Sequence, residues 1–158
     1  MKLITAIISF VLLVIGKPAI LKAQVSLKTN TVETALFVPF NASQLEEPAL
    51  LAQQIKAGKT DTPLILNIGA VQDIEGAKHI GPVSDPANLA AFKKAIADLP
   101  QNTLIVIYCG CCPFTKCPNI KPAFDELKRL GFTNAKVLDL PTNLKTNWIA
   151  SGYPLASK

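Results

Sequence analysis

The segment TLIVIYCGCCPFTKC, residues 103–117, decides which fold and chemistry this chain is predicted to have. Its first part, Thr103 to Tyr108, is mostly aliphatic and predicts a buried strand, and the stretch from Asn119 to Leu130 predicts a helix. Between them lie all the cysteines of the chain, which are Cys109, Cys111, Cys112 and Cys117. A thiol between the carboxyl end of a strand and the start of a helix lies where α/β proteins bind ligands. The function is therefore expected to depend on sulfur.

Strands and helices alternate along the rest of the chain. Apolar runs predict further strands at 63–68 and 135–140, with a weaker one at 35–40. Helices are expected at 43–56, 85–99 and 119–130, and a last helical turn at 143–151. The first of these helices is predicted from a Ser43–Glu46 capping box and a stop at Gly58. The alternation predicts an α/β fold, a parallel β-sheet flanked by helices on both faces.

The N-terminus has the layout of a secretory signal peptide. A basic start at Lys2 precedes an apolar run from Leu3 to Ile15, and Ala23 is a small residue at a cleavage position. The apolar run is shorter than the roughly 20 residues that a membrane-spanning helix needs, and an uncleaved N-terminal anchor is the alternative. We expect a signal peptide at 1–23, an N-terminal extension at 24–42 and the folded domain at 43–158. Export would place the domain in the periplasm or outside the cell.

Charge excludes one class of function. The chain has a net charge of +5, and removal of residues 1–23 takes away three lysines and no acids, leaving +2 (5 − 3). The single arginine is Arg129, and the sequence contains no basic stripe. Nucleic-acid binding is therefore not expected, nor is membrane binding after signal cleavage.

The order of motifs resembles that of a rhodanese-like domain. In that family a strand ends in the active-site cysteine, and a helix, a Gly-Phe pair, another strand and a Trp-x-x-x-Gly-Tyr-Pro segment follow. The matching segments here are LIVIYC at 104–109, LGF at 130–132, NAKVL at 134–138 and WIASGYP at 148–154. The strand at 63–68 and the His79-Ile80 pair resemble the N-terminal half of the family pattern, although Lys78 replaces a glycine.

The resemblance implies a sulfurtransferase or sulfur carrier. Cys109 would be the nucleophile that takes a sulfane sulfur and becomes a persulfide, because a thiolate is the reactive form of cysteine. Backbone N–H groups of the loop and of the following helix can stabilise an anion, and the anion-binding loop is expected to comprise Gly110, Thr115, Lys116 and Asn119. The expected partners are a small sulfur-containing anion or a thiol acceptor, together with a redox partner protein. No cofactor is expected.

The chain also departs from the family pattern. The loop after Cys109 is several residues longer than the usual one and contains no arginine, and it adds three cysteines. The earlier strand ends Asn67-Ile68-Gly69 where the family often has Asp-x-Arg. A phosphatase or arsenate reductase is disfavoured because the Cys-x5-Arg anion loop is absent, with Thr115 six residues after Cys109.

Three hypotheses remain open for the cysteines. In the first, Cys109 carries sulfur and Cys111, Cys112 or Cys117 acts as a resolving or disulfide-forming thiol. In the second, all four thiols bind a soft metal such as copper or zinc, with His79 as a further ligand, although the spacing is not that of paired Cys-x2-Cys zinc sites. In the third, Cys117 pairs with Cys111 or Cys112 and only staples the enlarged loop.

Overall fold

Five strands form one all-parallel sheet in this computed structural model, which describes residues 40–58 and 62–157. The order across the sheet is β1-β5-β4-β2-β3, which places β4 in the middle. The bounds of the strands are β1 (Leu45–Glu46), β2 (Leu64–Asn67), β3 (Lys78–His79), β4 (Ile105–Tyr108) and β5 (Ala135–Leu138). The predicted signal peptide and nearly all of the predicted extension and of the 35–40 strand lie outside the described residues. No helix in the described part of the chain is long and apolar enough to cross a membrane.

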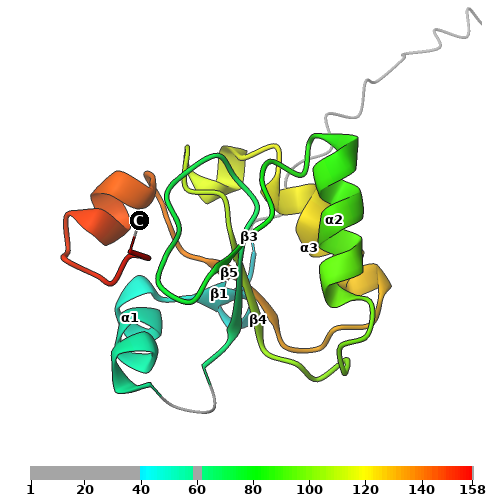
Figure 1. The fold of residues 1–158 in the computed structure, drawn as a ribbon, viewed down its shortest axis with the longest axis horizontal. Coiled ribbons are helices and arrows are strands. Elements are labelled where there is room, and N and C mark those ends of the chain that lie inside the picture. Colours follow the sequence, from blue (N-terminus) through cyan, green and yellow to red (C-terminus); the bar gives the residue numbers. More distant parts are fainter. Residues whose placement is uncertain (1–39, 59–61, 158) are drawn as a thin grey trace, which may run out of the picture. The chain divides into compact units, whose positions relative to one another are not determined.

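Helices cover both faces of the sheet, as Figure 1 shows, and the predicted α/β fold is confirmed. Two helices, α2 (Pro86–Ile96) and α3 (Ile120–Arg129), lie on one face. The other face is covered by α1 (Pro48–Ala57) and by a short π-helical turn at Lys145–Ile149. The loop after β4 contains a further 3-10 turn, Phe114–Lys116.

The central strand explains where the first cysteine points. All four residues of β4 are completely buried, and their side chains alternate between the faces because successive residues of a strand point in opposite directions. Ile105 and Ile107 belong to the core under α2 and α3, and Val106 and Tyr108 to the core on the other side. Cys109 continues this alternation and joins the core under α2 and α3.

The prediction for the start of α1 is wrong. The capping box is formed by Asn41 and Gln44, not by Ser43 and Glu46, and it closes only a short 3-10 turn. Leu45 and Glu46 then pair with β5 as strand β1, and the helix begins at Pro48. A residue before proline is restricted to extended backbone, so the chain cannot be helical through Glu47. The predicted stop at Gly58 is confirmed by its left-handed conformation, with φ +56°.

Tyr108 anchors the loop that follows β2. Its side chain is completely buried, and its hydroxyl oxygen accepts a hydrogen bond of 2.9 Å from the backbone N–H of Ile74. The hydroxyl in turn donates to the carbonyl of Gln72 at 3.4 Å. Burial raises the pKa of Tyr108 well above its ordinary value, so the phenol stays protonated. The burial of Tyr108 agrees with the predicted buried strand that ends at this residue.

We expect Tyr108→Phe to lower the free energy of unfolding by about 1–3 kcal/mol, because it leaves the buried N–H of Ile74 without an acceptor. Urea denaturation measures the loss. Tyr153→Phe is the matched control, since Tyr153 is only partly buried and its hydroxyl makes no hydrogen bond to the described residues. Equal losses in both variants would show that the Tyr108 hydroxyl does not hold the loop.

Candidate functional site

Cys109 lies at the centre of the carboxyl edge of the sheet. It directly follows β4, and only 2% of its surface is exposed. The end of β2 passes so close that a Cβ atom at Gly69 would lie 2.2 Å from the Cys109 carbonyl oxygen and 2.8 Å from its Sγ. Such contacts are far inside van der Waals distance, so glycine is required at this position for the two strand ends to approach.

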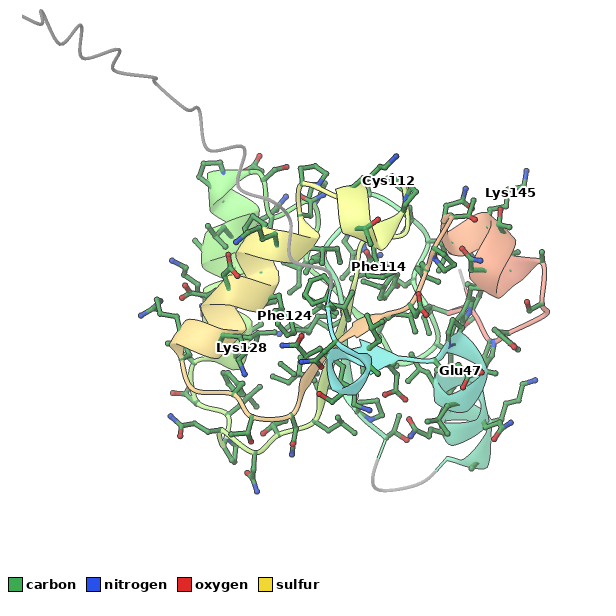
Figure 2. All side chains as sticks on the ribbon, turned by 180° about the vertical axis from the view of Figure 1, so that it is seen from behind. Glu47, Cys112, Phe114, Phe124, Lys128 and Lys145 are labelled. Atoms are coloured by element: carbon green, nitrogen blue, oxygen red, sulfur yellow. The ribbon has the colours of Figure 1, made fainter. Side chains whose placement is uncertain are left out.

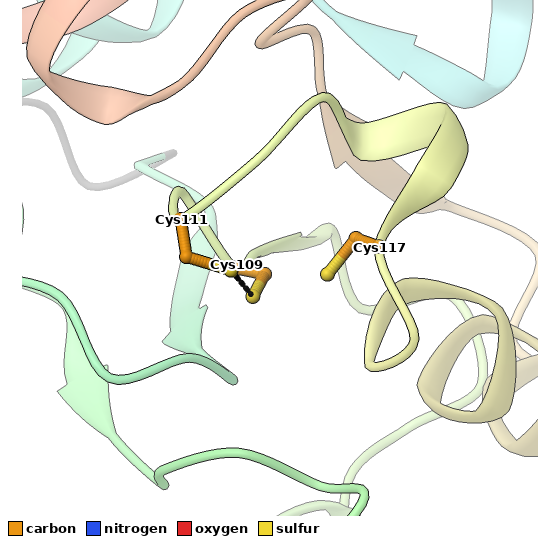
Figure 3. Close-up of side chains that lie close together, drawn as sticks. All are labelled: Cys109, Cys111 and Cys117. Carbon is orange, nitrogen blue, oxygen red and sulfur yellow. Dashed lines mark hydrogen bonds between the residues drawn. The ribbon is translucent and has the colours of Figure 1, made fainter.

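Three of the four cysteines bring their sulfur atoms together. Figure 3 shows the side chains of Cys109, Cys111 and Cys117 close together. Their Sγ atoms all lie within 4.8 Å of one another. We call these residues the three-thiol cluster. The Sγ atoms of Cys109 and Cys111 are 3.3 Å apart. Cys112 lies outside the cluster, although its Sγ is 3.5 Å from that of Cys111, and all four cysteines are free thiols.

The backbone of the loop explains why Cys111 turns back toward Cys109. Gly110 between them has φ +75°, a conformation that glycine adopts most readily. A Cβ atom at Gly110 would lie 2.9 Å from Cβ of Leu144, and the Gly110 carbonyl accepts a hydrogen bond of 2.9 Å from the Leu144 N–H. The reversal at Gly110 thus depends on packing against the C-terminal segment.

The other end of the loop is fixed by aromatic packing and by the start of α3. Phe114 and Phe124 lie near each other in Figure 2, and the ring of Phe40 contacts both, with centroid distances of 5.9 Å and 4.9 Å. Cys117 follows the 3-10 turn, and only 6% of its surface is exposed. The inserted loop therefore folds back, and its last cysteine meets its first.

Asn119 provides a side-chain hydrogen bond to the buried sulfur. Its Nδ2 donates to Cys109 Sγ at 3.3 Å, and its own exposure is 5%. The Oδ1 atom accepts a hydrogen bond of 2.8 Å from the backbone N–H of Ser84, which precedes α2. Because the oxygen is engaged by a donor, the amide nitrogen must face the sulfur. The amide therefore presents a fixed donor to Cys109.

These contacts make Cys109 the thiolate of the cluster. The hydrogen bond from the Cys117 thiol is the main cause that lowers the pKa of Cys109 to about 5, with help from Asn119 and Cys111 and against the effect of burial. The proton stays on the other two sulfurs. The pKa of Cys117 is raised by its bond to Cys109, and burial together with Cys109 raises the pKa of Cys111 to about 12. A single negative charge is thus held between thiol donors.

The remaining residues of the predicted anion-binding loop take different positions. Gly110 and Asn119 contact the cluster as described. Thr115 and Lys116 are exposed on the 3-10 turn, and among the described residues their side chains form no hydrogen bond or ion pair with a cysteine. The role of Thr115 and Lys116 in anion binding therefore stays a prediction.

His79 lies in a separate polar group. Its Nδ1 is 2.9 Å from Oδ1 of Asp73, and the Nδ2 of Asn67 is 2.8 Å from the same oxygen. Asn67 is completely buried at the end of β2, and its Oδ1 accepts a hydrogen bond from the Gly69 N–H at 3.0 Å. Within the described residues the cluster of metal-ligating atoms contains cysteines and not His79, so His79 is not brought to these sulfurs. Sequence reasoning noted Asn67 only as a departure from the family, and missed its role in shaping the turn beside Cys109.

A hollow of about 360 Å³ opens beside the cluster. Its wall includes Val71, Gly110, Cys111, Leu144, Lys145 and Ile149. Cys111 lines this hollow and Cys109 does not. The exposed thiol of the cluster, and not the buried one, is therefore the group that a molecule in the hollow would meet.

Comparison with known proteins gave one structural match of low sequence identity. No protein-family model matches the chain, and no curated protein is significantly similar to it. The chain is similar to the crystal structure of the Alr3790 protein from Anabaena sp., with 21% sequence identity and a TM-score of 0.49. The match covers 71% of this chain and 91% of that one.

We expect Asn119→Ala to raise the pKa of Cys109, because the variant removes a donor that favours the thiolate. The rate of Cys109 alkylation by iodoacetamide, followed by peptide mass mapping, should rise with pH through about 5 in the unaltered chain. The midpoint should move upward in the variant.

Asn88→Ala is the matched control for that variant. Asn88 donates to the carbonyl of Pro82 at 3.0 Å and so holds the same loop before α2, without contact to the sulfur. An unchanged midpoint in Asn119→Ala, or an equal shift in Asn88→Ala, would contradict a direct effect of the amide on Cys109.

Proposed function

We propose that this chain is a rhodanese-like sulfurtransferase or sulfur carrier that forms a persulfide on Cys109. The observation that carries the proposal is the environment of the Cys109 sulfur, which receives a hydrogen bond from the Asn119 amide and has the Cys111 sulfur at 3.3 Å and the Cys117 sulfur within 4.8 Å. These contacts favour the thiolate at neutral pH, and a thiolate is the form that attacks sulfur. The order of motifs in the sequence, which resembles that of the rhodanese-like family, also supports the proposal.

The proposed reaction is a displacement at a sulfane sulfur. The Cys109 thiolate attacks the outer sulfur of a donor such as thiosulfate, an S–S bond forms, and the donor's own S–S bond breaks with release of sulfite. The negative charge moves to the new outer sulfur. The Asn119 amide and the Cys111 and Cys117 thiols are donors within reach of that charge. Since Cys109 is 2% exposed, a small donor suits this site better than a large one.

We also propose that the domain works after export, in the periplasm or outside the cell. The signal-peptide layout of residues 1–23 supports this location. Thiols in such compartments tend to oxidise, so a redox partner protein would keep the cluster reduced. The small net charge of the chain without those residues supports a small sulfur-containing anion or a thiol as partner, rather than nucleic acid.

Anaerobic incubation of the reduced protein with thiosulfate tests the proposal through intact mass. The protein should gain one sulfur atom, and Cys109→Ser should gain none, because the nucleophile is missing. Cys112→Ser is the matched control and should gain the sulfur, since Cys112 lies outside the three-thiol cluster. Loss of the gain on later addition of a reducing thiol identifies the product as a persulfide. A Cys109→Ser variant that still gains sulfur would contradict the assignment.

A soft-metal-binding module is a second candidate, favoured by the close approach of three sulfur atoms. Thiolates suit Cu(I) and Zn(II), and the cluster supplies three ligands from Cys109, Cys111 and Cys117. A tetrahedral zinc site needs about four ligands, and among the described residues no fourth ligand atom lies within 4.8 Å of all three sulfurs. Cu(I) titration of the reduced protein distinguishes the candidates. Stoichiometric binding that each cluster Cys→Ser variant abolishes, without any gain of sulfur from thiosulfate, would replace the transferase proposal.

A further inference from the structure

We propose that sulfur leaves the site through Cys111, which takes it from Cys109 and passes it to a small thiol bound in the adjacent hollow. This inference rests on the proposed function of Cys109. Cys109 is 2% exposed, whereas Cys111 is exposed and lines the hollow. Their Sγ atoms are 3.3 Å apart. An acceptor cannot easily reach the buried Cys109 sulfur, but it can reach Cys111. Cys111 thus connects the buried sulfur with the surface.

The transfer step is balanced without an oxidant or reductant. The Cys111 thiol gives its proton to the outer sulfur of the Cys109 persulfide, and the Cys111 sulfur attacks that outer sulfur. The bond between Cys109 Sγ and the outer sulfur breaks, and its electron pair returns to Cys109 as the thiolate. Cys111 then carries the persulfide. A thiol acceptor attacks the outer sulfur, takes it as its own persulfide and leaves the Cys111 thiol behind.

The direction of transfer agrees with the environment of each sulfur. In thiol exchange, a leaving sulfur of low pKa departs faster, and the attacking thiol must first lose its proton, which here goes to the outer sulfur of the persulfide. The contacts from Cys117 and Asn119 stabilise the departing Cys109 thiolate, and Cys111 is the more basic partner. The turn at Gly110 holds the two sulfurs together at high effective concentration.

Neither of the other cysteines combines the same features. Cys117 is close to Cys109, but it is 6% exposed and does not line the hollow. Cys112 lies outside the three-thiol cluster and is not part of the wall of the hollow. Cys111 is therefore the cysteine that both touches the buried sulfur and faces the surface.

The hollow fits a small molecule better than a protein segment. Its volume of about 360 Å³ lies at the lower end of small-ligand sites, which run from about 300 to 1,000 Å³. Apolar side chains of Val71, Leu144 and Ile149 form much of the wall, and Lys145 adds a positive charge. A thiol of low molecular weight is the occupant that this space and this reactive group favour.

The relay is tested by separating loading from release. The unaltered protein, Cys111→Ser and Cys112→Ser are loaded with sulfur from thiosulfate under anaerobic conditions, freed of donor and mixed with mercaptoethanol as the probe thiol. We expect Cys111→Ser to load sulfur more slowly, because a donor to the Cys109 sulfur is lost, and to release the loaded sulfur at least ~10-fold more slowly, because the neighbouring thiol at high effective concentration is lost as well. Cys112→Ser should release it at the unaltered rate. Alkylation and peptide fragmentation of the loaded unaltered protein should locate sulfur on both Cys109 and Cys111.

The two proposals fail at different steps. If the unaltered protein loads no sulfur, the proposed function is wrong, and the proposed relay through Cys111 is wrong as well. If the unaltered protein and Cys111→Ser both load sulfur but the variant releases it within about twofold of the unaltered rate, or if sulfur is never found on Cys111, then the relay alone is overturned. Slow release in both serine variants would also contradict the specific role of Cys111.

Discussion

The hydrogen bond from the Asn119 amide to the Cys109 sulfur is the interaction on which the rest of the site depends. It joins the tip of the central strand to the start of α3, and the Cys117 sulfur lies within 4.8 Å of the same sulfur, so the two ends of the inserted loop meet there. It also helps to decide which sulfur carries the charge, because a thiolate in a buried position is stable only when donors surround it. The thiols of Cys111 and Cys117 complete that set of donors.

Close packing of the backbone makes this arrangement of sulfurs specific. Gly69 allows β2 to end directly against Cys109, and Gly110 allows the chain to reverse toward the C-terminal segment. A side chain at either glycine would collide with atoms that cannot move far, namely backbone at Cys109 or the Cβ of Leu144. The loop is therefore held by the sheet on one side and by the turn before Trp148 on the other. A loop held in this way fixes the distances between the thiols, as the proposed sulfur transfer requires.

The sequence predicts the parts of this structure that local patterns encode. The aliphatic run before Cys109 and the helix after it place this cysteine at the carboxyl edge of a central strand, as observed. Contacts between distant residues could not be predicted in the same way. The bond between Ser84 and Asn119 joins separate loops, and the two-residue strand β1 exists only through its pairing with β5. Likewise, the spacing of the cysteines does not show that Cys117 reaches Cys109 while Cys112 stays apart. The 3-10 turn and the contact between Phe40 and Phe114 determine the path of the loop and thus which cysteine approaches Cys109.

The central claim, that Cys109 is the thiolate of the three-thiol cluster, is tested most directly by counting thiolates as a function of pH. Thiolate absorbance in the ultraviolet is titrated for the reduced protein under anaerobic conditions and for Cys109→Ser. The account predicts one thiolate that forms with a midpoint near pH 5, is complete at neutral pH and is missing in Cys109→Ser. If no thiolate forms below pH about 8, as for an ordinary cysteine, or if the early thiolate persists in Cys109→Ser, the account is contradicted.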